Sequence, residues 1–252
     1  MISTINTTRY VMPLREGGSL PAIVEGDDKR LYVMKFRGAG QGVKALIAEL
    51  IGGEIARHLG FNIPKIVFGE LDESFGRIEG DEEIQDLLKA STGLNLAVEF
   101  LPEAITFDPI INKIDPLLAS KIVWLDSFLL NVDRTTRNTN MLIWRGNLWL
   151  IDHGASLIFH HNWDNGADGR RPFLLIRKHV LISQATRLNE ANEGFKSSLS
   201  KKLFEDVVAL IPDQWLNLDK SFPSAVENRK AYVDFLVSRL DYSDDFVKEA
   251  SL

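Results

Sequence analysis

The sequence contains 252 residues, with a formal net charge of −6 and no cysteine. A chain of this length can bury a sizeable core, as one large domain or as two smaller units. The negative charge gives no indication of direct nucleic-acid binding, and the lack of cysteine excludes disulfides, thiolate zinc sites and a cysteine nucleophile. No signal peptide and no apolar run of membrane-spanning length are present, so a soluble cytoplasmic protein is expected.

The first hundred residues predict strands and one strong helix. Residues 22–25 and 31–36 flank a turn at Gly26, which is typical of a hairpin. Apolar residues recur at helical spacing over 43–59, and Gly60 follows as a helix end. The other elements expected in this half are two further strands with an acidic helix between them, at 65–70, 95–101 and 81–90.

Beyond residue 102 the pattern becomes mostly helical. Asp115 and Pro116 begin a helix over 116–130 that is apolar on most sides and therefore buried. Two short strands follow, at 141–144 and 148–151, and amphipathic helices are expected at 172–185, 198–210 and 225–240. We predict an α+β fold of two lobes, a strand-rich N-lobe over 1–101 and a mainly helical C-lobe over 102–252. A ligand would bind in the cleft between them.

Lys35 is the first candidate site residue, because it interrupts an apolar run that reads as a strand. An ammonium group that points inward needs a partner, since an unpaired buried charge is costly. Glu49 is the candidate, because it shares a helix face with small residues that allow close approach to the sheet. The alternative is an edge-strand lysine in solvent and a surface glutamate.

A polar stretch after the buried helix supplies the next candidates, Asp133 and Asn138, and Asp152 follows the second strand pair. Taken singly, each could be an ordinary turn residue. Together with Lys35, an Asp, an Asn five residues later and a second Asp after a hairpin are typical of ATP-dependent phosphotransferases. Asp133 would orient the substrate hydroxyl, Asn138 and Asp152 would bind Mg²⁺, and Lys35 would contact the phosphates.

Two glycine-containing segments have different interpretations. Gly17, Gly18 and Ser19 precede the first strand pair and are predicted to place backbone N–H groups on the phosphates, although a Gly-Gly-Ser turn is also an ordinary loop. The segment 38–42 invites a dinucleotide-binding interpretation, but Val43 stands where that motif needs its third glycine. We interpret 38–42 as a flexible connection between a strand and a helix.

With these residues in place, the chain resembles the HipA-like kinases, bacterial serine/threonine kinases of toxin–antitoxin type, and specifically their shorter members. The matching residues span most of the chain: Gly17–Ser19, 32–36, Ala48 and Glu49, 59–64, Asp126, Asp133, Asn138, Asp152 and 178–181.

The resemblance implies a kinase fold with ATP and Mg²⁺ as cofactors, Asp133 as catalytic base, and Asn138 and Asp152 as metal ligands. It also implies Lys35 on the phosphates with Glu49 as its partner, and adenine against the backbone from Glu99 to Leu101. The chain departs from the family at Thr135, where a histidine is usual. It is also too short for the additional N-terminal subdomain of the full-length toxins, so an antitoxin-like partner is an open alternative rather than an expectation.

These observations predict an ATP-dependent phosphotransferase that acts on a protein serine or threonine hydroxyl, with Ser19 as a candidate site of self-modification. Two alternatives stay open. One is a nucleotide-binding pseudokinase with a regulatory role, and the other is a small-molecule or lipid kinase with the same metal chemistry. Substrate choice depends on surface loops whose shape the sequence does not reveal.

Overall fold

The fold is described from a computed structural model, which describes residues 2–14, 20–75, 80–163 and 168–251. Five strands of the N-terminal half close into a barrel, in the order β1-β2-β3-β5-β4. All neighbours pair antiparallel except β1 and β4, which are parallel. The strands are β1 (Thr4–Pro13), β2 (Ala22–Gly26), β3 (Leu31–Lys35), β4 (Ile66–Leu71) and β5 (Gly93–Glu99).

The predicted hairpin is confirmed as β2 and β3, whereas β1 was not predicted. Only Ile5 and Thr7 of β1 are buried, so its sequence lacks the apolar alternation that reveals a half-buried strand. The antiparallel partners of β3 on both sides also exclude the parallel strand that a dinucleotide-binding motif requires.

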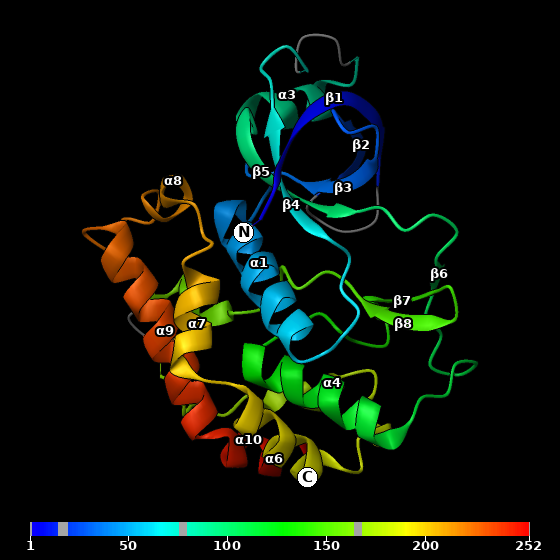
Figure 1. The fold of residues 1–252 in the computed structure, drawn as a ribbon, viewed down its shortest axis with the longest axis vertical. Helices are drawn as coiled ribbons and strands as arrows, with labels where there is room; N and C mark the ends of the chain where they lie inside the picture. Colours follow the sequence, from blue (N-terminus) through cyan, green and yellow to red (C-terminus); the bar gives the residue numbers. More distant parts are fainter. Residues whose placement is uncertain (1, 15–19, 76–79, 164–167, 252) are drawn as a thin grey trace.

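Helix α1 (Gly42–His58) lies outside the barrel and extends toward the helical half (Figure 1). Every residue from Leu46 to Gly53 is buried, because the helix is covered on all sides. Its two central glycines permit this close packing. A Cβ atom at Gly53 would lie 2.5 Å from Ile66 Cδ1, and one at Gly52 would lie 2.8 Å from His153 Cβ.

The C-terminal half is built around α4 (Pro116–Leu129), which begins where Asp115 accepts hydrogen bonds from the N–H groups of Leu117 and Leu118. Helix α4 packs against α6 (Leu188–Ser198) and α10 (Ser243–Ala250), and α7 (Lys201–Val208) packs against α9 (Ala225–Asp241). The remaining α-helices and strands are α3 (Glu82–Ala90), β6 (Ile105–Thr106), β7 (Met141–Trp144), β8 (Asn147–Leu150) and α8 (Asp213–Leu216). Figure 1 shows the barrel, with α3 beside it, at one end of the molecule and α4, α6 and α10 at the other.

The helix predicted over 172–185 is wrong. This segment forms two short 3₁₀ turns, Leu174–Lys178 and Ile182–Gln184. Between them, His179 forms a β-bridge with Thr135, and the N–H of Val180 donates to the carbonyl of Arg134 at 3.1 Å. These contacts with the loop after α4 take the place of helical hydrogen bonds.

Most other predicted elements occur within a few residues of their expected bounds, although β6, α6, α8 and α10 were not predicted. Among the residues that the structure describes, none of the helices combines the length and apolarity needed to cross a bilayer.

Candidate active site

Lys35 lies at the end of β3 and contacts two carboxylates. Its Nζ donates to Glu49 Oε2 at 2.7 Å and to Asp152 Oδ1 at 2.5 Å. The side chains of Lys35 and Glu49 are only 13% and 3% exposed, so neither group is in solvent. Burial alone would lower the pKa of Lys35, but the nearby charges of Asp152 and Glu49 outweigh it and raise this pKa. A fixed cation therefore joins β3, α1 and the segment after β8.

Asp152 has a backbone conformation that L-residues rarely adopt, with φ at 54°. The Lys35 ammonium is the main reason that the pKa of Asp152 is lowered, and the carboxylate is therefore charged. A Cβ at Gly154 would lie 3.4 Å from Asp152 Oδ1, which is an ordinary contact distance. The Asp152 side chain is 44% exposed, so part of its carboxylate faces outward.

Asp133 lies in the loop after α4, where two amides hold one of its oxygens. Oδ2 accepts from Asn138 Nδ2 at 2.8 Å and from Asn140 Nδ2 at 3.1 Å. The backbone N–H of Asp133 donates to Asn131 Oδ1 at 3.1 Å. Asn138 itself is exposed. Two amides therefore hold Asp133 Oδ2, while no protein donor of the described part contacts Oδ1.

The Asp133 loop lies beside the segment that carries Asp152. The N–H of Ile151 donates to the carbonyl of Asn140 at 3.1 Å. Arg134 Nη1 donates to the same carbonyl and, at 3.5 Å, to the carbonyl of Ile151. The pair of Asp133 and Asn138 and the pair of Lys35 and Asp152 are therefore carried by adjoining segments.

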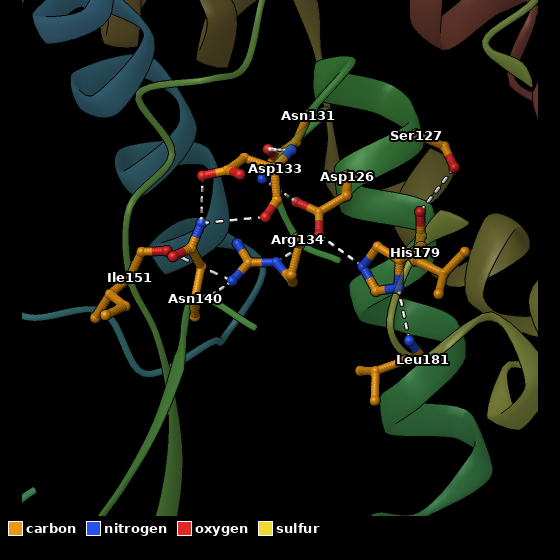
Figure 2. A network of polar contacts seen from close by, with 10 residues as sticks. Asp126, Ser127, Asn131, Asp133, Arg134, Asn140, Ile151, His179 and Leu181 are labelled. Carbon is orange, nitrogen blue, oxygen red and sulfur yellow. Dashed lines mark hydrogen bonds and ion pairs between the residues drawn. The ribbon is translucent and has the colours of Figure 1, made fainter. Parts of the chain in front are cut away.

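A buried carboxylate, Asp126, lies beneath this loop (Figure 2). It accepts from Arg134 Nε at 2.5 Å, His179 Nε2 at 2.9 Å and Asn131 Nδ2 at 2.9 Å. Burial by itself would raise the pKa of Asp126, but Arg134 and His179 hold it well below its usual range. The sequence patterns assigned Asp126 no role. A single acid in an otherwise apolar helix was the available signal, because a buried charge must be paired.

The side chains of Asn138 and Asp152 are suited to bind a divalent cation. Asn138 and Asp152 offer an amide oxygen and a carboxylate oxygen, which are ligands that Mg²⁺ accepts. Within the described residues there is no cluster of three or more His, Cys, Asp or Glu side chains that could hold a metal ion. A metal here would take its other ligands from phosphate and water, as Mg²⁺ commonly does with nucleotides. The residues present fit such an ion.

The residues expected to contact adenine are Glu99, the last residue of β5, and the connector that follows it. The N–H of Glu99 donates to the carbonyl of Lys65 at 2.8 Å, and that of Phe100 donates to Leu31 at 2.9 Å. Leu101 is buried, and its N–H donates to no backbone carbonyl in the described part of the chain. The predicted phosphate-loop residues Gly17, Gly18 and Ser19 lie outside the described residues; in sequence they separate β1 from β2.

Two hollows in the described part of the chain lie away from these polar side chains. Two hollows, of about 360 and 410 Å³, lie beside α1, and neither is lined by Lys35, Asp133 or Asp152. Glu99 lines the second of them with Lys65. We therefore define the candidate active site by its polar side chains, Lys35, Glu49, Asp133, Asn138 and Asp152.

Solved structures with a similar fold include kinases. The crystal structure of a Helicobacter pylori proinflammatory kinase, CtkA, superposes with a TM-score of 0.54 at 14% identity, covering 98% of this chain and 96% of that chain. The Golgi casein kinase gives a TM-score of 0.53 at 12% identity, covering 98% and 72%. Its Mn/ADP-bound structure gives 0.51 at 11% identity, covering 98% and 73%. Comparison with curated protein sequences gave no match.

The fold is therefore the two-lobed protein-kinase-like fold, as predicted, with a strand-rich N-lobe and a mainly helical C-lobe. The family model for HipA-like kinases matches residues 8–249. The chain belongs to the HipA-like kinase family, and its class is that of the phosphotransferases.

Proposed function

We propose that this protein is an ATP-dependent kinase that uses Mg²⁺ to phosphorylate a serine or threonine hydroxyl of a protein. The observation that carries the proposal is the position of Lys35, bonded to Glu49 and Asp152 at 2.7 and 2.5 Å. A cation from the barrel and a carboxylate from the helical half meet beside the Asp133 loop. We also propose a division of the chain into lobes at residues 1–101 and 102–252.

Lys35 is suited to bind phosphate. It is charged, mostly buried and held by Glu49 on α1, so its position is fixed by two regular elements. ATP would supply the transferred phosphoryl group, and Mg²⁺ would offset the negative charge on the phosphate oxygens. Asn138 and Asp152 are the proposed metal ligands. The Golgi casein kinase structure with Mn and ADP bound supports a nucleotide and a divalent cation in this fold.

Asp133 is proposed as the residue that orients the acceptor hydroxyl. Its Oδ2 is held by Asn138 and Asn140, which leaves Oδ1 to accept the hydroxyl proton. The N–H of Leu101 and the backbone near Glu99 are proposed to bind adenine. Gly17, Gly18 and Ser19 are proposed to contact the phosphates.

A thermal-shift titration with ATP, with and without Mg²⁺, tests nucleotide binding. A hundredfold excess over Kd is expected to stabilise the folded protein by about 2.7 kcal/mol if only that state binds. ADP release and the intact mass of the same sample then report turnover and self-modification. No shift with millimolar MgATP contradicts the proposal.

Two variants separate an active kinase from a pseudokinase. Asp133→Ala is expected to keep the ATP-induced shift and to reduce ADP release by about 10²–10⁴-fold. The matched control Asp86→Ala removes an exposed acid on α3 and should behave as wild type. ATP binding without turnover in the wild type supports a pseudokinase, whereas turnover that requires an added metabolite or lipid supports a small-molecule or lipid kinase.

A further inference from the structure

The carboxylate of Asp126 connects three segments that are separate in the sequence. Asp126 lies within α4, Arg134 and Asn131 belong to the Asp133 loop, and His179 lies between the two 3₁₀ turns (Figure 2). Asp126 and Arg134 side chains are both 0% exposed, and that of His179 is 2% exposed. Asn131, the third donor, is also buried, so all three donors to this carboxylate are shielded from water.

From these contacts we propose that Asp126 and His179 are positioning residues for phosphoryl transfer. The inference rests on the proposed function, since it concerns how the Asp133 loop is held. Asp126 orients Asn131, which in turn accepts from the Asp133 N–H at 3.1 Å. It also orients Arg134, which binds the carbonyls of Asn140 and Ile151. Through these contacts, one carboxylate helps to position both Asp133 and Ile151, the residue that precedes Asp152.

Stability alone is a weak reason to keep such a group. Removing charges from water is costly, and a buried ion pair is often no more stabilising than apolar residues of similar size. The directional contacts of Asp126 provide something that an apolar side chain does not. They fix three segments relative to one another, and misplacement of a reacting group by about 1 Å can reduce a rate by about 10²-fold.

The proton on His179 is fixed by its neighbours. Nδ1 accepts from the N–H of Leu181 at 3.0 Å, so it carries no proton. Nε2 therefore carries the proton and donates to Asp126 Oδ2 at 2.9 Å. The neutral ring satisfies both partners, and each ring nitrogen can be imitated by a different amide side chain.

This arrangement provides a matched pair of variants. His179→Gln places an amide N–H₂ near the Nε2 position and keeps a donor for Asp126, but it loses the acceptor for Leu181. His179→Asn keeps an acceptor for Leu181 but loses the donor for Asp126. In assays of ADP release, we expect His179→Asn to have a kcat at least 10-fold lower than that of the wild type, with the KM for MgATP within about twofold. The kcat of His179→Gln should stay within about threefold of the wild-type value. Equal kcat values for the two variants would overturn the proposal.

Hydrogen exchange of residues 131–140 provides a readout that needs no turnover. His179→Asn is expected to exchange faster in this loop than His179→Gln, with the barrel unchanged. If the wild type releases no ADP, the proposed function fails, but the exchange comparison still decides the positioning role. Equal loop exchange in both variants overturns it. Should His179→Asn fail to fold, Arg134→Lys replaces it, because a single ammonium group does not reproduce the separate Nε and Nη1 contacts of Arg134.

Discussion

The two halves of the molecule hold their functional side chains in different ways. In the N-terminal half, Lys35 lies on a strand hydrogen-bonded on both sides, and Glu49 lies on a helix, so backbone hydrogen bonds fix both. In the C-terminal half, Asp133 and Asn138 lie in an irregular loop that side-chain contacts with buried Asp126 and its partners secure. Regular elements position a group through the main chain, whereas this loop depends on buried polar side chains.

The largest expected effect comes from removing one charge in each half. Asp126→Asn leaves the guanidinium of Arg134, 0% exposed, without an anion and should lower the free energy of unfolding by roughly 3–5 kcal/mol. Glu49→Gln is the matched change in the other half, and it should cost only about 1 kcal/mol, because Lys35 keeps Asp152 as a partner. Urea unfolding of both variants measures the difference. Similar losses would remove the distinction between the halves.

Lys35 is where the two halves meet, and its loss should affect catalysis strongly. Lys35→Met removes the proposed phosphate contact and is expected to reduce the rate of ADP release by about 10²–10³-fold. It also leaves Glu49, whose side chain is 3% exposed, without its cation. The double variant with Glu49→Leu should recover stability without recovering turnover.

Lys89→Met is the control for Lys35→Met, since Lys89 is exposed on α3 and contacts no residue of the cluster. Its rate should equal that of the wild type. A double variant that regained activity as well as stability would show that Lys35 serves the fold rather than the phosphates.

A smaller effect is expected where α1 packs against the residue that follows Asp152. In Gly52→Ala the new Cβ would lie 2.8 Å from His153 Cβ, so α1 or the Asp152 segment must shift. We expect a loss of about 1–3 kcal/mol in the free energy of unfolding and lower turnover. Gly194→Ala on α6 is the control, because nothing lies within 4 Å of the added Cβ, and it should stabilise by about 0.5–1 kcal/mol. Opposite signs in thermal melts would support the close approach of α1, and equal shifts would contradict it.

Sequence patterns predicted the regular elements around the site well. Helical spacing over 43–59 and the single lysine of the β3 run were sufficient to place Glu49 near Lys35, because a buried cation on a strand must find a carboxylate on the next packed element. The hairpin after residue 140 likewise follows from its two short apolar runs.

The contacts that hold the Asp133 loop could not be predicted from sequence patterns in the same way. Asp126 and His179 are 53 positions apart, and no periodicity relates them. The helix predicted over 172–185 failed for the same reason, since the contacts of His179 and Val180 with the loop break the helical pattern. Amphipathic spacing reports which face is buried, but not which backbone groups find partners elsewhere.

Acid should act mainly on the C-terminal half, which contains the three buried histidines His153, His160 and His179. Burial is the main cause that lowers the pKa of each, to about 4 for His153 and well below the usual value for His160. Between pH 6.5 and those values the unfolded chain binds protons that the folded chain does not. The free energy of unfolding should therefore decrease as the pH is lowered, by up to about 1.4 kcal/mol per pH unit for each histidine.

His160→Gln tests this dependence outside the candidate site, because the His160 ring contacts the Tyr232 hydroxyl and none of the proposed functional residues. Urea unfolding between pH 6 and 5 should show a smaller slope of unfolding free energy against pH. The expected decrease is up to about 1.4 kcal/mol per pH unit, which is the contribution of one bound proton. His58→Gln, at an exposed position on α1, is the matched control and should keep the wild-type slope. If both variants changed the slope equally, acid sensitivity would not originate in the buried histidines, and the two halves would respond to pH alike.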